Sequence, residues 1–212
     1  MDSSFDGPAQ VGFQNINGKC WMSSLVQAIY ACKPLLHKIL RVKCQNILVI
    51  GLQKALQLLS ERKRVLTQGH DYGAGAISVL NVQNFYDIAY DITRNNGQPD
   101  GETSTLLVKL NDIFRTSCGM PEFFNFGNEA YISAIITTPG ENLNVFLKTY
   151  HITLSGEPEF IIICVDTQGV QSTRTRVDRQ ISIGPYRFQI CAIILGTGGH
   201  FYTITNDGRY DD

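Results

Sequence analysis

The N-terminal half of the chain carries its hydrophobic residues at helical spacing. Over residues 22–30 the apolar side chains fall at i, i+3, i+4, i+7 and i+8, which places them on one face of a helix. Pro34 is expected to close that helix, because the residue before a proline disfavours the α conformation. Similar stripes over 48–59 and 106–114 predict two further helices, whereas 79–92 is ambiguous, with a weaker helical signal.

The C-terminal half changes to strand-forming residues. Segments rich in Ile, Val, Phe, Tyr and Thr, separated by turn signals, are interpreted as strands at 130–138, 144–154, 160–165, 186–195 and 200–205. Helices followed by antiparallel strands predict an α+β fold, in which the seam between the two halves is a natural cleft. We expect one domain over residues 1–212, with a tail at 1–9, a helical half at about 10–120 and a β-rich half at about 121–212.

The composition narrows the possible partners. The chain has 43% hydrophobic and 17% charged residues and a formal net charge of −1, so nothing electrostatic indicates nucleic acid or an anionic membrane surface. No apolar stretch reaches the ~18 residues of a membrane span. The first residues also lack the charged and apolar regions of a signal peptide, so we expect a cytoplasmic or nuclear protein rather than a secreted one.

The six cysteines argue against a metal or disulfide framework. No two of them form a C-x-x-C pair, the usual signature of a structural zinc site. Without a secretory signal, disulfides are not expected either. Cys164 and Cys191 lie in apolar, strand-like segments and are interpreted as buried core residues. The sequence therefore predicts no metal ion and no cofactor.

Cys20 stands where the first predicted helix begins. The turn dipeptide Asn17-Gly18 precedes it, and the helical stripe starts at Met22. A cysteine in the first turn lies among unpaired backbone N–H groups and at the positive end of the helix dipole, both of which stabilise a thiolate. This position favours a nucleophile, and a structural cysteine is an equally weighted alternative from position alone.

The end of the chain combines a hairpin signal with a histidine and a carboxylate. Asp207-Gly208 is a two-residue turn signal between strand-like residues. A turn there pairs Ile204 with Asp211, so that Asp211 shares a face of the ladder with His200 and can fix its tautomer. A bulge would reverse this assignment. The other histidines are interpreted as structural or solvated: His37, His70 and His151.

The N-terminal segment resembles the cysteine box of the ubiquitin-specific proteases. Residues 12–22, Gly-Phe-Gln-Asn-Ile-Asn-Gly-Lys-Cys-Trp-Met, place Asn15 five residues before Cys20, where that family has its oxyanion-hole asparagine. Residues 98–102, Gln-Pro-Asp-Gly-Glu, open the third predicted helix and are similar to the family's Gln-Asp-Ala-x-Glu-Phe-Leu element. Within them, Asp100 is a candidate N-cap of that helix.

The C-terminal segment is similar to the histidine box of the same family. Residues 186–195, Tyr-Arg-Phe-Gln-Ile-Cys-Ala-Ile-Ile-Leu, lead into Gly199-His200-Phe201, and the chain ends on Tyr210-Asp211-Asp212. The order of the three elements agrees with the family, and the resemblance spans roughly residues 10–212. It implies a papain-like fold with the active site at the seam between the helical and β halves.

The chain departs from the family at several positions. Lys19 and Trp21 flank the cysteine in place of the usual threonine and tyrosine, and Arg209 stands where a tryptophan is usual. Only about forty residues separate the third predicted helix from the late strands, where the family carries zinc-binding fingers that grip ubiquitin. No finger and no zinc fit there. The compact size is closer to that of the papain-like proteases of RNA viruses.

The resemblance implies acyl transfer by a thiol protease. Cys20 would attack a carbonyl carbon, His200 would take the proton and later return it, and Asp211 would orient His200. Asn15 would donate a hydrogen bond to the developing oxyanion, together with a backbone N–H near Cys20.

Three further residues are candidates for substrate binding: Gly198, Gly199 and Asp100. The two glycines would line a narrow channel for an extended tail of small residues such as Gly-Gly. A simple turn explains these glycines equally well.

Three functions are consistent with these residues. The first is a deubiquitinase that hydrolyses the bond after the C-terminal Gly-Gly of ubiquitin or a ubiquitin-like modifier on conjugated proteins. The second is a viral polyprotein protease that cuts Gly-rich junctions, and one enzyme could do both. The third, an inactive ubiquitin-binding module, ranks last because all the candidate catalytic residues are present. We expect a monomer whose partners are proteins.

Overall fold

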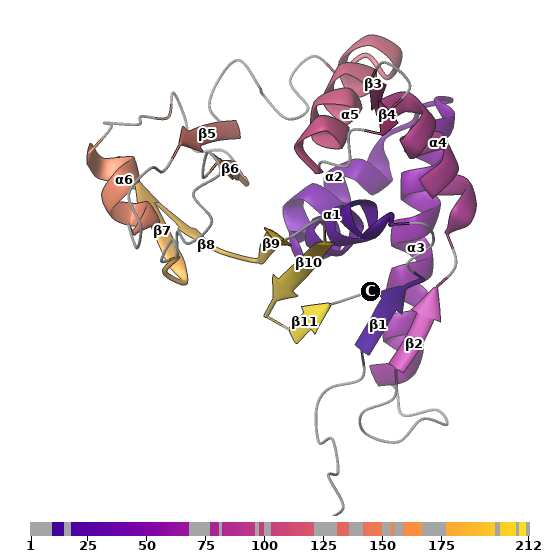
Figure 1. Cartoon of the computed structure of the whole chain (residues 1–212), viewed down its shortest axis with the longest axis horizontal. Coiled ribbons are helices and arrows are strands. Elements are labelled where there is room, and N and C mark those ends of the chain that lie inside the picture. Colours follow the sequence, from indigo (N-terminus) through magenta and orange to yellow (C-terminus); the bar gives the residue numbers. More distant parts are fainter. Residues whose placement is uncertain are drawn as a thin grey trace, which may run out of the picture. The chain divides into compact units, whose positions relative to one another are not determined.

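The computed structural model has two compact units (Figure 1). The first unit combines Met1–Gly119 with Cys191–Asp212, and the second is Met120–Ile190. Within them, the structure describes residues 10–14, 18–67, 77–80, 82–95, 98–99, 103–120, 131–135, 142–149, 154, 159–166, 177–197, 200–206 and 208–210. The C-terminal strands therefore belong to the same unit as the N-terminal helices.

The first unit contains most of the helices. They are α1 (Cys20–Ala31), α2 (Lys33–Arg41), α3 (Ile47–Thr67), α4 (Gln83–Thr93) and α5 (Thr103–Ser117). The predicted helices at 22–30, 48–59 and 106–114 are thus confirmed, and the ambiguous stretch 79–92 contains the end of a short strand and then α4. Pro34 lies in the first turn of α2, where its missing N–H costs no helical hydrogen bond.

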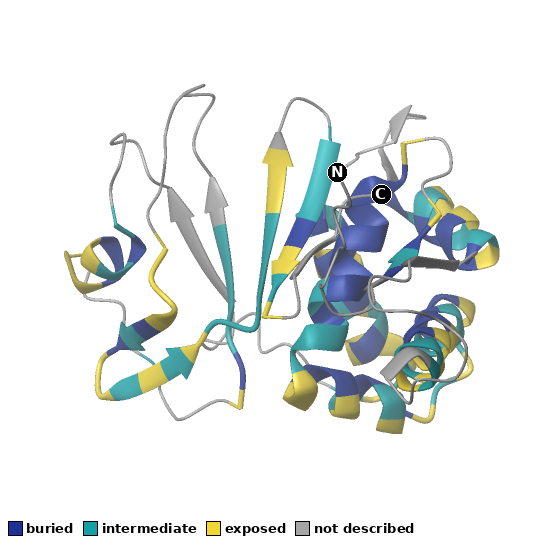
Figure 2. Cartoon of the chain, turned by 90° about the horizontal axis from the view of Figure 1, so that it is seen from below, coloured by how far each residue is buried: buried dark blue, intermediate teal, exposed yellow. Residues whose placement is uncertain are grey.

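Helix α1 is the centre of the first unit. It packs against α2, α3 and α5 and against two C-terminal strands, so nearly its whole circumference is buried (Figure 2). Two of its buried polar side chains hydrogen-bond to other segments. Gln27 donates through Nε2 to the carbonyl oxygen of Val11 at 2.8 Å, and Ser23 hydrogen-bonds to the hydroxyl of Tyr86. These bonds offset the cost of removing polar groups from water.

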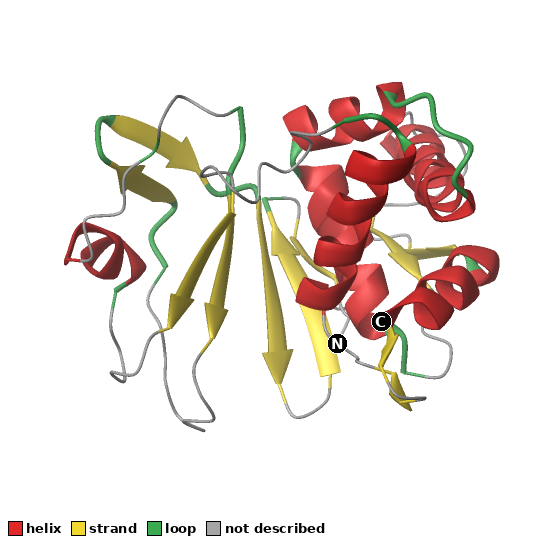
Figure 3. Ribbon diagram, turned by 90° about the horizontal axis from the view of Figure 1, so that it is seen from above, coloured by secondary structure: helices red, strands yellow, loops and turns green. Residues whose placement is uncertain are grey.

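The strands of the first unit form small sheets. They are β1 (Gln10–Phe13), β2 (Ile77–Leu80), β3 (Arg94–Asn95), β4 (Gln98–Pro99), β9 (Ala192–Thr197), β10 (His200–Thr205) and β11 (Gly208–Tyr210). β1 and β2 pair in parallel, β3 and β4 pair antiparallel, and β11-β10-β9 is an antiparallel sheet that packs on α1 through β9 and β10. Figure 3 shows these strands among the helices.

The second unit has strands and one short helix among its described residues. These are β5 (Tyr131–Ile135), α6 (Leu143–Thr149), β6 (Ile162–Asp166), β7 (Gln180–Ile183) and β8 (Tyr186–Gln189). β5 and β6 pair in parallel, whereas β7 and β8 form an antiparallel hairpin. The strand predicted at 130–138 is confirmed over Tyr131–Ile135, the part that the structure describes. The strand predicted at 160–165 is confirmed from Ile162 onward, and the one at 200–205 is confirmed in full. The strand predicted at 186–195 is divided into β8 and β9. The prediction of antiparallel strands in the C-terminal half is wrong for β5 and β6, which pair in parallel.

The strand predicted at 144–154 is wrong over its first half, which is helix α6. Leu143, Phe146 and Leu147 lie at positions i, i+3 and i+4 and are buried against Ile181 and Ile183 of β7. This helical spacing of buried residues explains why the segment is a helix despite its strand-forming composition. The side chain of Asn142 accepts the backbone N–H of Asn144 at 2.8 Å, which caps the start of this helix.

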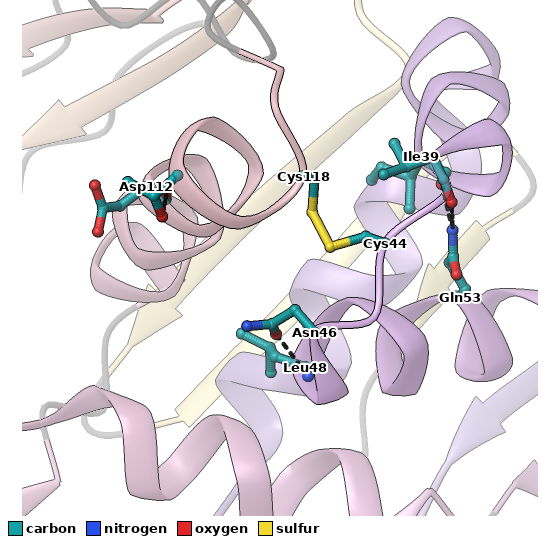
Figure 4. The surroundings of a disulfide bond; sticks show 9 residues. Ile39, Cys44, Asn46, Leu48, Gln53, Asp112 and Cys118 are labelled. Atoms are coloured by element: carbon teal, nitrogen blue, oxygen red, sulfur yellow. Dashed lines mark hydrogen bonds between the residues drawn. A yellow bond between two sulfur atoms is a disulfide. The ribbon is translucent and has the colours of Figure 1, made fainter.

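A disulfide joins Cys44 and Cys118, contrary to the expectation that the chain has none (Figure 4). Cys44 lies in the connection between α2 and α3, and Cys118 follows directly after α5. Their Cα atoms are 5.1 Å apart, within the range a disulfide requires. Packing of helix ends that are 74 residues apart along the chain creates this pair, and no local motif marks it.

Among the described helices, none has both the length and the apolar character that crossing a membrane requires.

Candidate active site

Cys20 is the first residue of α1, as the sequence predicts. Gly18, just before it, has a φ of +70°, a left-handed conformation that glycine adopts without strain and that turns the chain into the helix. Cys20 is only 2% exposed. Its Sγ accepts a hydrogen bond from the backbone N–H of Phe201, with the N and S atoms 3.4 Å apart.

His200 is the first residue of β10 and is half-buried. The strand is fixed on α1 at two points. One is the Phe201–Cys20 contact, and the other is the Oγ1 of fully buried Thr203, which donates to the carbonyl oxygen of Ser24 at 2.8 Å. α1 and β10 therefore lie alongside each other from the Cys20 end onward. The fold thus brings the strand that begins at His200 to the helix that begins at Cys20.

The segment that opens α5 reaches the same end of α1. Thr103, the first residue of α5, donates through Oγ1 to the carbonyl oxygen of Trp21 at 3.3 Å. Just upstream, Gln98 pairs with Asn95 in the β3–β4 ladder. The described residues next to all three sequence elements, the cysteine, middle and histidine segments, thus come together around the first turn of α1.

Lys19, beside Cys20, forms an ion pair in which the lysine is nearly buried and the carboxylate of Asp87 is exposed. The side chain of Lys19 is 7% exposed, and its Nζ lies 2.6 Å from Oδ1 of Asp87 in α4 and 5.5 Å from the centre of the Tyr90 ring. The hydrogen bond from Lys19 lowers the pKa of Asp87 below its usual value, and the Lys19 charge and Gln83 act in the same direction. This pair anchors the residue before the candidate nucleophile to α4.

Several predicted site residues lie outside the described residues: Asn15, Asp100, Gly198, Gly199 and Asp211. The ladder that leads to Asp211 is described up to Tyr210, and its register differs from the prediction. Ile204 pairs with Arg209 instead of Asp211, and Thr205 pairs with Gly208. The observed register therefore differs from the predicted one by two residues.

Sequence reasoning missed three features of this site: the N–H of Phe201, the Lys19–Asp87 pair and the Thr103–Trp21 bond. In the sequence, Lys19 is notable only because it stands where the cysteine box of the ubiquitin-specific proteases has a threonine. Nothing in the sequence connects it with Asp87. Among the described residues, no group of three or more His, Cys, Asp or Glu side chains could hold a metal ion.

No protein-family model matches the chain, and no curated protein is significantly similar to it.

Proposed function

We propose that the chain is a thiol protease, an isopeptidase that cleaves after the C-terminal Gly-Gly of ubiquitin or a ubiquitin-like modifier. The observation that carries the proposal is the hydrogen bond from the N–H of Phe201 to the Sγ of Cys20. It joins the residue after His200, the proposed general base, to the thiol at a helix start, although the two are 181 residues apart along the chain. Hydrolysis by a cysteine nucleophile requires the thiol and its general base to lie close together in the fold.

The proposed reaction proceeds in two halves. Cys20 transfers its proton to His200 and its sulfur attacks the carbonyl carbon of the terminal glycine. His200 then donates the proton to the leaving amine, which leaves a thioester on Cys20. Water, deprotonated by His200, hydrolyses the thioester and releases the glycine carboxylate. Asp211 orients His200, and Asn15 donates to the oxyanion in both halves.

The near-complete burial of Cys20 supports a substrate with little side-chain bulk. A thiol that is 2% exposed can be approached by an extended Gly-Gly tail more readily than by residues with Cβ branches. Gly198 and Gly199, directly before His200, fit the lining of such a channel. Polyprotein junctions that end in Gly-Gly offer the same chemistry, and we keep them as a second substrate of the same site.

The test is covalent labelling with ubiquitin that carries a C-terminal electrophile. We expect the wild-type protein to be labelled and Cys20→Ala and His200→Ala to be inert, whereas Cys164→Ala is a matched control that keeps labelling. A panel of ubiquitin, ubiquitin-like and Gly-Gly peptide reporters then assigns the substrate. Cleavage of the peptides alone favours the polyprotein junctions, and binding of ubiquitin without labelling indicates an inactive module. A wild-type protein that neither labels nor cleaves contradicts the proposal.

A further inference from the structure

Lys19 is an unusual residue for the start of a helix. It is the N-cap of α1, and its carbonyl oxygen accepts the backbone N–H groups of Met22 and Ser23 at 3.0 and 3.3 Å. A lysine side chain has no acceptor with which to cap the remaining N–H groups, and a positive charge at the start of a helix opposes the helix dipole. Local preference therefore works against the helix at the position where Cys20 begins it.

Helix α4 provides the support that the first turn of α1 lacks. Nζ of Lys19 lies 2.6 Å from Oδ1 of Asp87, and the centre of the Tyr90 ring lies 5.5 Å from the same Nζ. At the other end of this turn, the hydroxyl of Ser23 hydrogen-bonds to that of Tyr86, the residue next to Asp87. Two neighbouring residues of α4 therefore hold the first turn of α1, one just before the nucleophile and one just after it.

The two partners of the ion pair differ in exposure, and this difference fixes the lysine. The side chain of Lys19 is 7% exposed, whereas that of Asp87 is 55% exposed. A buried ammonium group that lost its partner would carry a large desolvation penalty, so Lys19 stays at Asp87. Asp87 is itself oriented by Nε2 of Gln83, which donates to Oδ1 at 2.5 Å. α4 thus presents a preorganised anchor for the residue before Cys20.

We propose that Lys19 is a positioning residue for the reaction of Cys20. Its anchor on α4 holds the backbone directly before Cys20 and so fixes where α1 presents the sulfur. The role is exerted through the backbone, because the charge of Lys19 is already paired with that of Asp87. The proposal rests on the thiol chemistry proposed above, and it adds a residue that flanks the nucleophile without taking part in proton transfer.

The contact between Cys20 and Phe201 depends on both of its sides. On the strand side, Thr203 fixes β10 to the carbonyl oxygen of Ser24. On the helix side, Lys19 fixes the residue directly before the thiol. Reacting atoms have to lie ~3–3.5 Å apart, and a misplacement of ~1 Å can lower a rate ~100-fold. Loss of the Lys19 anchor should therefore slow the chemical step without weakening substrate binding.

The experiment measures kcat and KM with ubiquitin that carries a fluorophore on its C-terminal glycine, at a temperature at which circular dichroism shows every variant folded. We expect Lys19→Met to lower kcat by roughly 10- to 100-fold while KM stays near the wild-type value. Asp87→Ala, at an exposed position, should act in the same direction, and the double variant should lose no more than the larger single loss. Lys19→Arg should keep most of the rate, because its guanidinium also pairs with a carboxylate.

Lys33→Met is the matched control. Lys33 also lies over a tyrosine ring, 4.0 Å from the centre of Tyr30, but it is exposed and begins α2. Its kcat should stay near that of the wild type. The proposal is overturned by an unchanged kcat in Asp87→Ala, by a change in KM alone, or by Lys19→Arg losing as much as Lys19→Met.

A second measurement does not depend on ubiquitin. If the wild type cleaves no reporter, the proposed function fails, and the rate at which iodoacetamide alkylates Cys20 still tests the hold of Lys19 on it. Cys20 is only 2% exposed, so a loosened first turn should speed its alkylation in Lys19→Met and Asp87→Ala but not in Lys33→Met. A local opening exposes little surface, so this rate should change little with dilute urea. An unchanged rate in Lys19→Met overturns the proposal, and so does a rate that rises steeply with urea, which would report opening of the whole unit.

Discussion

The backbone N–H of Phe201 donates to the Sγ of Cys20 across 181 residues of sequence. The donor is a main-chain group, so the geometry of the bond depends on the position of the β10 backbone and not on the side chain of Phe201. Two of the features that hold β10 in place are its pairing with β9 and the bond from Thr203 to α1. The first two predictions test these supports.

Gly196 makes room for the ring of Phe201. The two residues are directly paired across β9 and β10, and a Cβ on Gly196 would lie 2.9 Å from Cε1 of Phe201. Gly196→Ala should therefore displace the ring and lower the free energy of unfolding by ~1–2 kcal/mol. Chemical denaturation measures this loss, and labelling by the ubiquitin probe should slow with it.

The control for Gly196 is Gly12→Ala in β1, where an added Cβ meets no atom within 4 Å. Its free energy of unfolding should stay within about 0.5 kcal/mol of the wild type. Equal losses at both positions would show that the Phe201 ring is not the cause.

Thr203→Val tests the second support. The hydroxyl of Thr203 is fully buried and donates to the carbonyl oxygen of Ser24. Valine keeps the shape and removes the donor, so we expect a loss of ~1–2 kcal/mol in the free energy of unfolding. Thr116→Val is the matched control, because its hydroxyl makes the same kind of bond to Asp112 on the exposed face of α5, where water can replace it. If Thr203→Val were as mild as the control, β10 would not depend on this bond.

The elements with a long, regular hydrophobic period are the ones that the sequence predicts well. α1, α3 and α5 appear where the spacing of their apolar residues places them, and Cys20 begins α1 as expected. Helix α6 shows the limit, because it has only 7 residues and its strand-forming composition outweighed a short helical period. The register of β10 and β11 depends on which residues form the turn. A turn at Asp207-Gly208 pairs Ile204 with Asp211, whereas the observed partner of Ile204 is Arg209, two residues earlier.

The tertiary partners of the site could not be predicted from one sequence. Asp87 is one carboxylate among many, and its pairing with Lys19 arises only when α4 packs beside the start of α1. The Cys44–Cys118 bond has the same origin, because it joins the ends of helices that local sequence does not align. The contact between Cys20 and Phe201 also has no local signal, since the two residues lie 181 positions apart along the chain.

The Lys19–Asp87 pair should make stability sensitive to acid. The pKa of Asp87 is lowered in the folded protein, so the contribution of the pair is complete above the unfolded-state pKa of ~3.9 and is lost as the pH falls through the folded value. In Asp87→Asn this part of the acid dependence should disappear, and the protein should be less stable near neutral pH because the nearly buried Lys19 loses its partner.

Thermal unfolding at a series of pH values measures this difference. Asp112→Asn is the matched control, since Asp112 forms an exposed pair with Arg115 that contributes little. Parallel acid profiles for the wild type and Asp87→Asn would contradict the assigned role of the pair.

The Cys44–Cys118 disulfide should contribute measurably to stability. It closes a loop over a sequence separation of 74 residues, which restricts the unfolded chain, so Cys44→Ala should lower the free energy of unfolding by ~2–4 kcal/mol under non-reducing conditions. Cys118→Ala should give the same loss, and the double variant should lose no more than either single one. A double variant that lost the sum of both would show that the two cysteines act separately.

The pKa of Cys191, which directly precedes β9, should depend on a hydrogen bond from Cys32, which lies between α1 and α2. Because this bond is the largest cause of the lowered pKa, the rate of alkylation of Cys191 should rise to half its maximum near pH 7 in the reduced wild-type protein. Cys32→Ala removes this donor, while burial still raises the pKa of Cys191. The pH at which alkylation reaches half its maximum rate should therefore move upward.

Iodoacetamide pulses at each pH, quantified on the peptide that contains Cys191, separate this residue from the other thiols. Cys164→Ala provides the control, because Cys164 lies in β6 of the second unit and should leave the Cys191 midpoint unchanged. A midpoint that stays in place in Cys32→Ala would mean that backbone donors alone lower the pKa of Cys191.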